Sequence, residues 1–340
     1  MDELNVGVIG VGLQGQIHAK SYSLLKEANL EAIADINEKK ARKIAEKLDV
    51  PKMYKNYENM LEDPEIEAVS VATPDFLHRD PVIDSIEAEK HVLCEKPMAT
   101  KIEDAEDMIK AWEKSDVKFM VCFENRWNPP FRDAKRKIEN GDIGRPIYIY
   151  ARLNAKRSVP LEMLSWSDKS SPVFFIAVHT LDLCRWFGES NVSVVDAHGC
   201  SGFLKERGAD VLDSVQSLIT LENDVECLME SNWILPESFP HGYDFEFGVY
   251  GSEGTLEVNT THQTCSVTTD DSFIYPEIFR IMSVDDSPYG FVPGAVRHFV
   301  QSVLEDKAPM TSPLDGKAAT EAALAILESI DKNKTVKLSE

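Results

Sequence analysis

The sequence predicts an α/β protein of two domains: a Rossmann domain with a doubly wound parallel sheet, then an α+β domain with a large, mostly antiparallel, open sheet. An apolar run at residues 4–9 leads directly into a G-x-G-x-x-G turn. Apolar strands alternate with helices as far as residue 123, which is typical of a parallel sheet. Beyond that point strand-like segments follow one another with few helices between them. We therefore expect domains at residues 1–123 and 124–340, and the length of 340 residues accommodates both.

The first predicted elements are a buried strand, a glycine turn and a helix over residues 16–26. In such a unit the first glycine permits the tight turn, the second lets a pyrophosphate approach the backbone, and the third lets the helix pack on the strand. The start of the helix offers unpaired N–H groups and a positive dipole end to phosphate. The residues expected to bind a dinucleotide here are Gly10, Gly12, Leu13, Gln14 and Gly15.

An acidic residue follows the second predicted strand. Residues 30–34 are apolar and end in Asp35, twenty residues after Gly15, where a carboxylate accepts hydrogen bonds from the ribose hydroxyls of the cofactor. The same carboxylate would repel a 2′-phosphate, and no arginine follows it directly, so NAD is favoured over NADP. The alternative is a glycine turn in an unrelated α/β protein, with Asp35 as a helix cap.

Further polar residues follow later strands of the first domain. Strands are predicted at residues 68–72, 91–94 and 117–123, and helices at residues 38–48, 57–61, 78–88 and 100–114. Ligands of doubly wound sheets bind outside the carboxyl ends of the strands. Thr73 with Pro74, and then Lys96, follow two such ends, so we expect them to converge with Gly10 and Asp35 on one crevice.

The second domain is predicted from strands that often alternate between apolar and polar residues. They lie at residues 146–153, 192–198, 213–221, 225–232, 245–250, 255–258 and 266–269. Helices are predicted at residues 128–140, 178–187, 294–305 and 315–331. Successive strands with few intervening helices favour antiparallel pairing.

Composition excludes several classes of function. The formal net charge of −22 argues against binding to nucleic acid or to an anionic membrane. No window approaches 18 uncharged apolar residues, so no membrane span is expected. The six cysteines show no C-x-x-C spacing, and no pair of histidines has a metal-binding spacing, so neither a disulfide frame nor a metal site is expected. Because the chain begins directly with a strand, we expect no signal peptide and a cytoplasmic location.

Two residues are candidates for proton chemistry. Lys96 lies at a buried strand end between Glu95 and Pro97, where an ammonium group is costly unless a carboxylate or a ligand satisfies it; the alternative is a solvated lysine that caps a helix. His179 lies in an apolar helix and shares a face with Asp182. It could exchange a proton with a substrate hydroxyl, and the alternative is a hydrogen-bonded core histidine.

Two other polar residues have less specific positions. His78 follows a strand end, where it either contacts the nicotinamide ribose or caps the next helix. Arg126 stands at the expected domain junction and is predicted to line the cleft.

The chain resembles the Gfo/Idh/MocA oxidoreductases, a family that includes glucose–fructose oxidoreductase and inositol dehydrogenases. The segments that carry the resemblance are residues 10–15 with His18, Thr73-Pro74 with His78, residues 91–97, 141–144, 179–182 and 251–255, and the closing segment 290–338. The resemblance implies NAD or NADP, a sugar, sugar derivative or cyclitol substrate, and a homodimer or homotetramer formed through the open sheet. It also implies that Lys96 and His179 are the catalytic lysine and histidine, and it adds Glu95 to the cofactor set.

One position departs from the family pattern. An aspartate commonly stands four residues before the histidine, and here that position holds Phe175. The residues expected to bind substrate are Lys96, Arg126, Phe175, His179 and Asp182. The leading hypothesis is hydride transfer between nicotinamide and a secondary alcohol or ketone. A non-catalytic regulator that binds NAD and a sugar, and a dehydrogenase of a nucleotide-linked sugar, remain alternatives.

Overall fold

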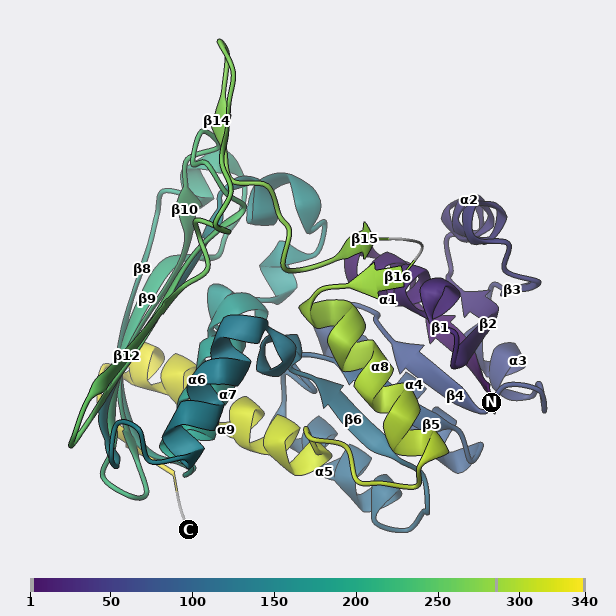
Figure 1. Cartoon of the computed structure of the whole chain (residues 1–340), viewed down its shortest axis with the longest axis horizontal. Coiled ribbons are helices and arrows are strands. Elements are labelled where there is room, and N and C mark those ends of the chain that lie inside the picture. The colour runs from purple at the N-terminus through teal and green to yellow at the C-terminus, as the bar shows by residue number, and fades with distance from the viewer. Residues whose placement is uncertain (1–2, 285–286, 339–340) are drawn as a thin grey trace. The chain divides into compact units, whose positions relative to one another are not determined.

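The computed structural model describes residues 3–284 and 287–338. The chain divides into two compact units, each with its own sheet (Figure 1). The first unit comprises residues 1–128 and 279–317, and the second comprises residues 129–278 and 318–340. Each unit is described by itself below.

The first unit is built on a six-stranded sheet in the order β3-β2-β1-β4-β5-β6. The strands are β1 Leu4–Ile9, β2 Ala28–Ala34, β3 Lys52–Tyr54, β4 Ala68–Val71, β5 His91–Glu95 and β6 Phe119–Cys122. Every neighbouring pair is parallel, and the strand order reverses between β1 and β4. The predicted doubly wound Rossmann sheet is therefore confirmed.

Helices connect these strands and cover the sheet. They are α1 Leu13–Leu24, α2 Glu38–Leu48, α3 Tyr57–Leu61, α4 Arg79–Glu87 and α5 Ile102–Trp112, with the short helices η1 Asp75–Leu77 and η2 Glu124–Trp127. The sequence explains this arrangement, since β4 is wholly buried and α2 carries a strongly charged outer face.

Residues 279–317 depart from the expected domain boundary. We assigned residues 124–340 to the second domain, whereas this segment, with β15 Met282–Val284, β16 Ser287–Tyr289 and α8 Phe291–Leu304, belongs to the first unit. The reason is burial: Val296 and Phe299 of α8 lie in the same apolar cluster as Val6 of β1. An apolar helix face in a sequence does not reveal which sheet it covers.

The second unit is built on a seven-stranded sheet in the order β12-β11-β7-β10-β9-β8-β17. Its strands are β7 Pro146–Lys156, β8 Val192–Ser201, β9 Leu212–Leu221, β10 Glu226–Leu235, β11 Tyr243–Gly251, β12 Thr255–Asn259 and β17 Val336–Lys337. Only the β7–β10 pair is parallel among the described pairings, which confirms the mostly antiparallel sheet. The strand expected at residues 266–269 is the short β13 Val267–Thr268, which pairs with β14 Phe273–Ile274 outside this sheet.

The two faces of this sheet differ. Figure 1 shows α6 Pro129–Glu139 and α7 Val178–Gly188 on one face, and α9 Pro313–Lys332 also contributes to that core. Alternate residues of β7, such as Ile149 and Ala151, are buried there. The remaining side chains point to the opposite face, as the alternation in the sequence predicts. The remaining short helices are η3 Val159–Met163, η4 Ser167–Lys169, η5 Val173–Ala177 and η6 Lys205–Arg207.

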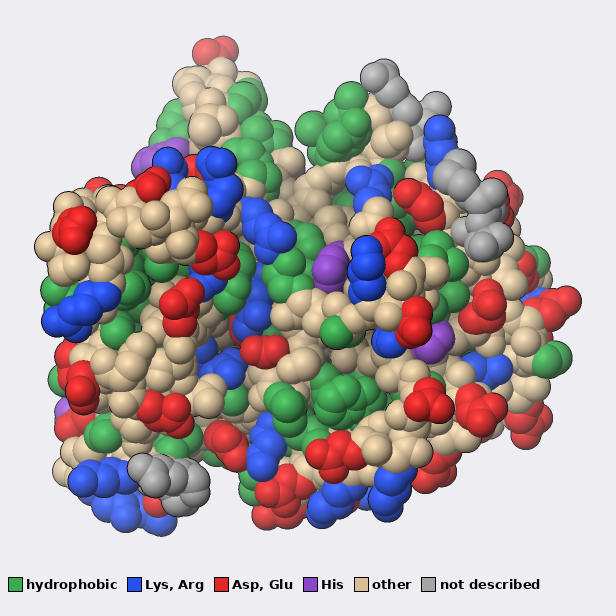
Figure 2. Space-filling model, turned by 60° about the horizontal axis from the view of Figure 1, so that its bottom comes forward, with side chains coloured by type: hydrophobic (Ala, Val, Ile, Leu, Met, Phe, Trp, Pro, Cys, Tyr) green, Lys and Arg blue, Asp and Glu red, His purple; other side chains and the backbone are tan. Residues whose placement is uncertain are grey.

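The surface is acidic without forming one acidic patch on the face in view. Figure 2 shows aspartates and glutamates spread among lysines and arginines. Within residues 3–284 and 287–338, no helix has both the length and the apolar character needed to cross a bilayer.

Candidate active site

At two positions of the turn after β1, any residue other than glycine would clash with neighbouring backbone atoms. Gly10 has φ +85°, and a Cβ built on it would lie 2.8 Å from the carbonyl oxygen of Ala72. A Cβ on Gly15 would lie 1.8 Å from the carbonyl oxygen of Gly10. The tight turn beside the backbone that follows β4 therefore requires Gly10, and the close approach of α1 to the turn requires Gly15, as the sequence pattern indicated.

Gly12 serves a different purpose. It is the N-cap of α1, no side chain caps that helix, and no acidic residue lies in its first turn. A Cβ on Gly12 would have only the carbonyl oxygen of Ala72 within 4 Å, at 3.9 Å. The space above Gly12 and the N–H groups at the start of α1 fit a pyrophosphate, so this part of the chain is suited to a dinucleotide.

Asp35 lies beside the turn, where β2 ends. Its Oδ2 accepts a hydrogen bond from the N–H of Val11 (2.9 Å), and its Oδ1 accepts one from the N–H of Asn37 (2.8 Å). The next residue, Ile36, is 84% exposed. The structure thus brings the predicted acidic residue to the glycine turn. No arginine stands directly after Asp35, since Ile36 occupies that position.

His78 connects the loops that follow β4 and β5. The ring is 1% exposed; its Nδ1 lies 2.8 Å from the carbonyl oxygen of Pro97 and its Nε2 lies 3.0 Å from that of Thr73. Pro74, the N-cap of η1, lies in the first of these loops. Because both ring nitrogens contact backbone carbonyls, the ring holds the two loops together, and the expected contact of His78 with the nicotinamide ribose stays a prediction.

Lys96 and Glu95 lie at the carboxyl end of β5. Lys96 is 8% exposed, and its peptide bond with Pro97 is cis. The Oε1 of Glu95 lies 2.9 Å from Nε2 of His18 and accepts a hydrogen bond from Nε2 of Gln14 at 3.4 Å. The Oε2 of Glu95 accepts the backbone N–H of Lys96 (3.2 Å). The carboxylate of Glu95 is thus buried against protein groups, and its expected contact with the cofactor stays a prediction.

Two buried carboxyl groups in this region have opposite pKa shifts. Burial alone would raise the pKa of Glu95, but the hydrogen bond from His18 and the nearby charge of Lys96 outweigh it, so this pKa is lowered. Burial and the charge of Glu95 raise the pKa of Glu124 to about 7, against the opposing charges of Lys96 and Arg280.

Sequence reasoning missed both Glu124 and Arg280. Glu124 had a usable signal, because it directly follows a predicted strand. Arg280 donates a hydrogen bond to Oε1 of Gln14 from 266 residues away, and no local pattern indicates such a contact.

The raised pKa of Glu124 predicts a pH-dependent stability. Between pH 4.5 and about 7 the unfolded chain releases this proton while the folded chain retains it, so the free energy of unfolding falls as the pH rises. Relative to Glu124→Gln, which does not titrate, the wild type should lose about 3 kcal/mol between pH 4 and pH 8. Urea denaturation of both proteins at the two pH values measures this difference. Glu113→Gln, at an exposed residue, is the control, and a difference that does not change with pH would contradict the prediction.

Arg126 is buried and bound to protein groups of the first unit. The side chain is 5% exposed, and its Nη2 forms an ion pair with Oδ1 of Asp315 (3.0 Å) within the first unit. Its Nη1 also donates a hydrogen bond to the carbonyl oxygen of Met310 (3.4 Å). A buried guanidinium needs such partners. These contacts hold the Arg126 guanidinium in place within the first unit, and its expected position along a substrate cleft stays a prediction.

The second unit contains the other predicted residues. His179 is 9% exposed in the first turn of α7, and Asp182 is buried on the same helix. Phe175 is half-buried on η5 and packs edge-on against Trp233, with ring centroids 5.7 Å apart. The structure thus gathers the glycine turn, Asp35 and Lys96 in the first unit, and holds His179, Asp182 and Phe175 in the second.

The fold and these residues define a Rossmann-type oxidoreductase, and comparison with known proteins gives the family. Residues 4–123 match the model of the oxidoreductase family with an NAD-binding Rossmann fold, and residues 131–257 match the GFO/IDH/MocA C-terminal domain. The chain belongs to the Gfo/Idh/MocA oxidoreductase family. It is an oxidoreductase with an NAD-binding domain.

Similar proteins extend over the whole chain. Myo-inositol 2-dehydrogenase of Thermotoga maritima is 28% identical over 99% of both chains. Levoglucosan dehydrogenase of Pseudarthrobacter phenanthrenivorans is 32% identical over 76% of this chain and 74% of its own length. A solved structure of levoglucosan dehydrogenase in complex with NADH is similar to this chain, with a TM-score of 0.85 and 25% identity over 100% of both chains.

Proposed function

We propose that this chain is an NAD-dependent dehydrogenase that oxidises a secondary alcohol of a cyclitol or sugar. The observation that carries the proposal is the convergence of the glycine turn, Asp35 and the Glu95–Lys96 segment at the carboxyl ends of the parallel strands β1, β2 and β5, linked by the hydrogen bonds described above. The names of the relatives, inositol 2-dehydrogenases and a levoglucosan dehydrogenase, support this substrate class.

The residues proposed to hold NAD are those around the edge of the first sheet. They are Gly10, Gly12, Leu13, Gln14, Gly15, Asp35, Thr73, Pro74 and Lys96. His78 and Glu95 support this set through the Thr73 and Lys96 loops.

Two side chains are proposed to act on the substrate oxygen. NAD, when bound, supplies the nicotinamide ring that accepts the hydride from the carbinol carbon. His179 accepts the proton of the substrate hydroxyl at a ring nitrogen. The ammonium of Lys96 donates a hydrogen bond to the same oxygen and stabilises the negative charge that develops on it. Asp182 and Phe175 are the proposed further substrate residues of the second unit.

Asp35 is expected to determine the choice between NAD and NADP. Asp35→Asn keeps an oxygen for the N–H of Val11 and removes the charge that repels a 2′-phosphate. The ratio of the Kd for NADP⁺ to that for NAD⁺ should therefore fall about tenfold or more. Isothermal titration with both cofactors measures it. Asp49→Asn, which removes one charge at the far end of α2, is the control. An unchanged ratio would contradict a ribose-binding role for Asp35.

A substrate panel tests the activity directly. The purified protein is assayed at 340 nm with NAD⁺ and with myo-inositol, scyllo-inositol, levoglucosan, glucose and a nucleotide-linked sugar. Turnover of a cyclitol or a free sugar supports the proposal. Turnover of the nucleotide-linked sugar alone would show instead that the protein is a dehydrogenase of nucleotide-linked sugars. Binding of NADH without turnover of any member would favour the second candidate function.

The second candidate is a regulator that binds NAD and a sugar without catalysis. The observation that favours it is Phe175: its ring packs against Trp233, where the family commonly has a carboxylate. A phenyl ring neither accepts a hydrogen bond from a substrate hydroxyl nor stabilises a positive charge on His179 as a carboxylate does. Lys96 and His179 favour the enzyme.

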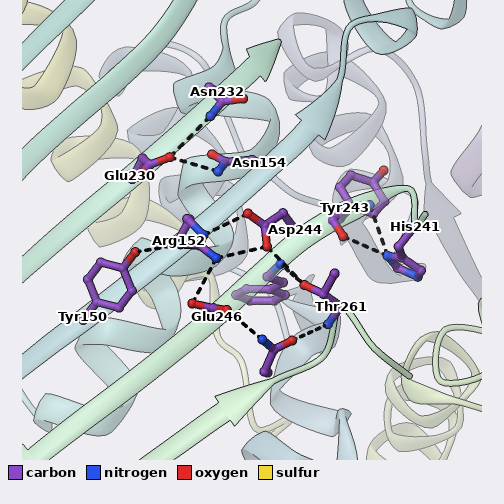
Figure 3. A network of polar contacts seen from close by, with 12 residues as sticks. Tyr150, Arg152, Asn154, Glu230, Asn232, His241, Tyr243, Asp244, Glu246 and Thr261 are labelled. Carbon is purple, nitrogen blue, oxygen red and sulfur yellow. Dashed lines mark hydrogen bonds and ion pairs between the residues drawn. The ribbon is translucent and has the colours of Figure 1, made fainter. Parts of the chain in front are cut away.

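The face of the second sheet opposite α6 and α7 carries features that favour self-association. Figure 3 shows Arg152 of β7 bound to Asp244 and Glu246 of β11, at 2.9 and 3.0 Å. Leu218 and Leu228 on the adjacent strands are 50% and 41% exposed on the same face. Exposed apolar side chains beside an arginine fit an interface, because arginine is enriched at interfaces and exposed apolar surface gains from being covered. We therefore propose a homo-oligomer formed through this face, and sedimentation analysis determines its size.

A further inference from the structure

A chain of hydrogen bonds lies behind Lys96 inside the first unit. Tyr22 OH lies 2.8 Å from Oγ of Ser70, which lies 3.1 Å from Nδ1 of His18. The opposite ring nitrogen of His18 lies 2.9 Å from Oε1 of Glu95. Tyr22, Ser70 and His18 have no exposed surface, and Glu95 is 3% exposed. Four polar side chains can be buried side by side in this way only when each of them has a hydrogen-bond partner.

The carboxylate of Glu95 fixes one end of this chain of hydrogen bonds. Its pKa is lowered, so it is charged and accepts from Nε2–H of His18. Ser70 connects Nδ1 of His18 to the hydroxyl of Tyr22, and burial raises the pKa of Tyr22, so that hydroxyl keeps its proton. The second oxygen of Glu95 accepts the backbone N–H of Lys96. The chain therefore ends at the residue that we propose to act on the substrate oxygen.

A metal site is a different explanation of part of this cluster. The ligand-type atoms of His18, Glu95 and Cys122 lie within 4.8 Å of one another. However, the His18–Glu95 distance of 2.9 Å is that of a direct hydrogen bond. Burial also raises the pKa of the Cys122 thiol well above its usual range, which disfavours the thiolate that binds metals. The geometry favours hydrogen bonding.

We propose that His18 is a positioning residue for Lys96 that acts through Glu95, an inference that depends on the proposed function. The imidazole fixes the orientation and the charge of the Glu95 carboxylate. That carboxylate in turn fixes the backbone of Lys96 and provides the negative charge beside its ammonium. A lysine that must donate to one substrate oxygen loses rate when it is displaced by as little as about 1 Å.

Replacement of His18 has a specific expected signature. Without the hydrogen bond from His18, burial raises the pKa of Glu95, so the carboxylate becomes protonated at higher pH and the Lys96 site loses its negative neighbour. The acid limb of the pH profile should then move to higher pH, whereas a general loss of folding would lower activity at every pH. The titratable groups that face Glu95 are His18, His78, Lys96, Cys122 and Glu124.

The variants are His18→Leu, which removes the donor, and His18→Gln, whose amide can donate near the position of Nε2. His298→Leu is the matched control, because His298 of the first unit accepts the N–H of Met310 outside the chain of hydrogen bonds. Three quantities are measured: kcat from pH 5 to 9, the Kd of NADH, and the rate of Lys96 acetylation against pH in cofactor-free protein, relative to the exposed Lys101.

His18→Leu should lower kcat about 10- to 100-fold with the Kd of NADH within threefold. It should also move the acid limb to higher pH and change the Lys96 acetylation profile, and His18→Gln should restore most of both. A kcat and an acetylation profile equal to those of His298→Leu would overturn the proposal.

A second variant keeps the proposal testable if His18→Leu does not fold. Glu95→Gln keeps an oxygen for His18, and it should change the same two quantities; an unchanged acetylation profile there also overturns the proposal. The acetylation readout is independent of turnover. If Lys96→Met retained full activity, the proposed function would fail, while a changed acetylation profile would still show that His18 acts on Lys96.

Discussion

Lys96→Met should lower kcat/KM for the best cyclitol or sugar substrate by roughly 10³-fold, while the Kd of NADH changes by less than about fivefold. Methionine has a similar length but no ammonium group, so the substrate oxygen loses a hydrogen-bond donor and the charge that stabilises it in the transition state. Steady-state kinetics measures the first quantity and fluorescence titration the second.

The control for Lys96→Met is another buried lysine. Lys135 is similarly buried, at 6% exposed, and forms an ion pair with Glu189 at 2.6 Å in the second unit. Lys135→Met should reduce stability modestly, because it removes the ion pair that this buried ammonium forms with the exposed Glu189, and should leave kcat/KM within a few-fold. If Lys96→Met turned over the substrate as fast as the wild type, the proposed catalytic role of Lys96 would be contradicted.

Gly15→Ala and Gly12→Ala should separate folding from cofactor binding. The new methyl group at position 15 would meet the carbonyl oxygen of Gly10 at 1.8 Å, which forces α1 away from β1. We expect a loss of about 3 kcal/mol or more in the free energy of unfolding. The methyl group at position 12 has only one protein atom within 4 Å, so stability should change by less than about 1 kcal/mol.

The same methyl group at position 12 occupies the space assigned to the pyrophosphate. Gly12→Ala should therefore weaken NAD⁺ binding roughly 10- to 100-fold in a protein that unfolds like the wild type. Urea denaturation and isothermal titration of the two variants give both quantities. Full NAD⁺ affinity in Gly12→Ala would place the cofactor somewhere other than over this turn.

Local patterns in the sequence identified most of the first sheet and its edge. The glycine spacing, Asp35 and the polar residues after each strand are short-range signals, because a parallel sheet places every strand's carboxyl end at one edge. The same reasoning predicted the mostly antiparallel second sheet from period-two alternation. The untested roles of Lys96 and His179 came from residue type and family resemblance, and they remain proposals.

The sequence by itself determined the class of the protein, the dinucleotide turn and the candidate residues, because each depends on neighbours within one supersecondary unit. Only the tertiary structure showed that α8 joins the first core, that Arg126 pairs with Asp315, and that His18 binds Glu95. These are contacts between side chains 77 or more residues apart, and a buried charge takes whichever distant partner the packing brings within reach. The order of residues along the chain does not show which of these distant side chains come into contact.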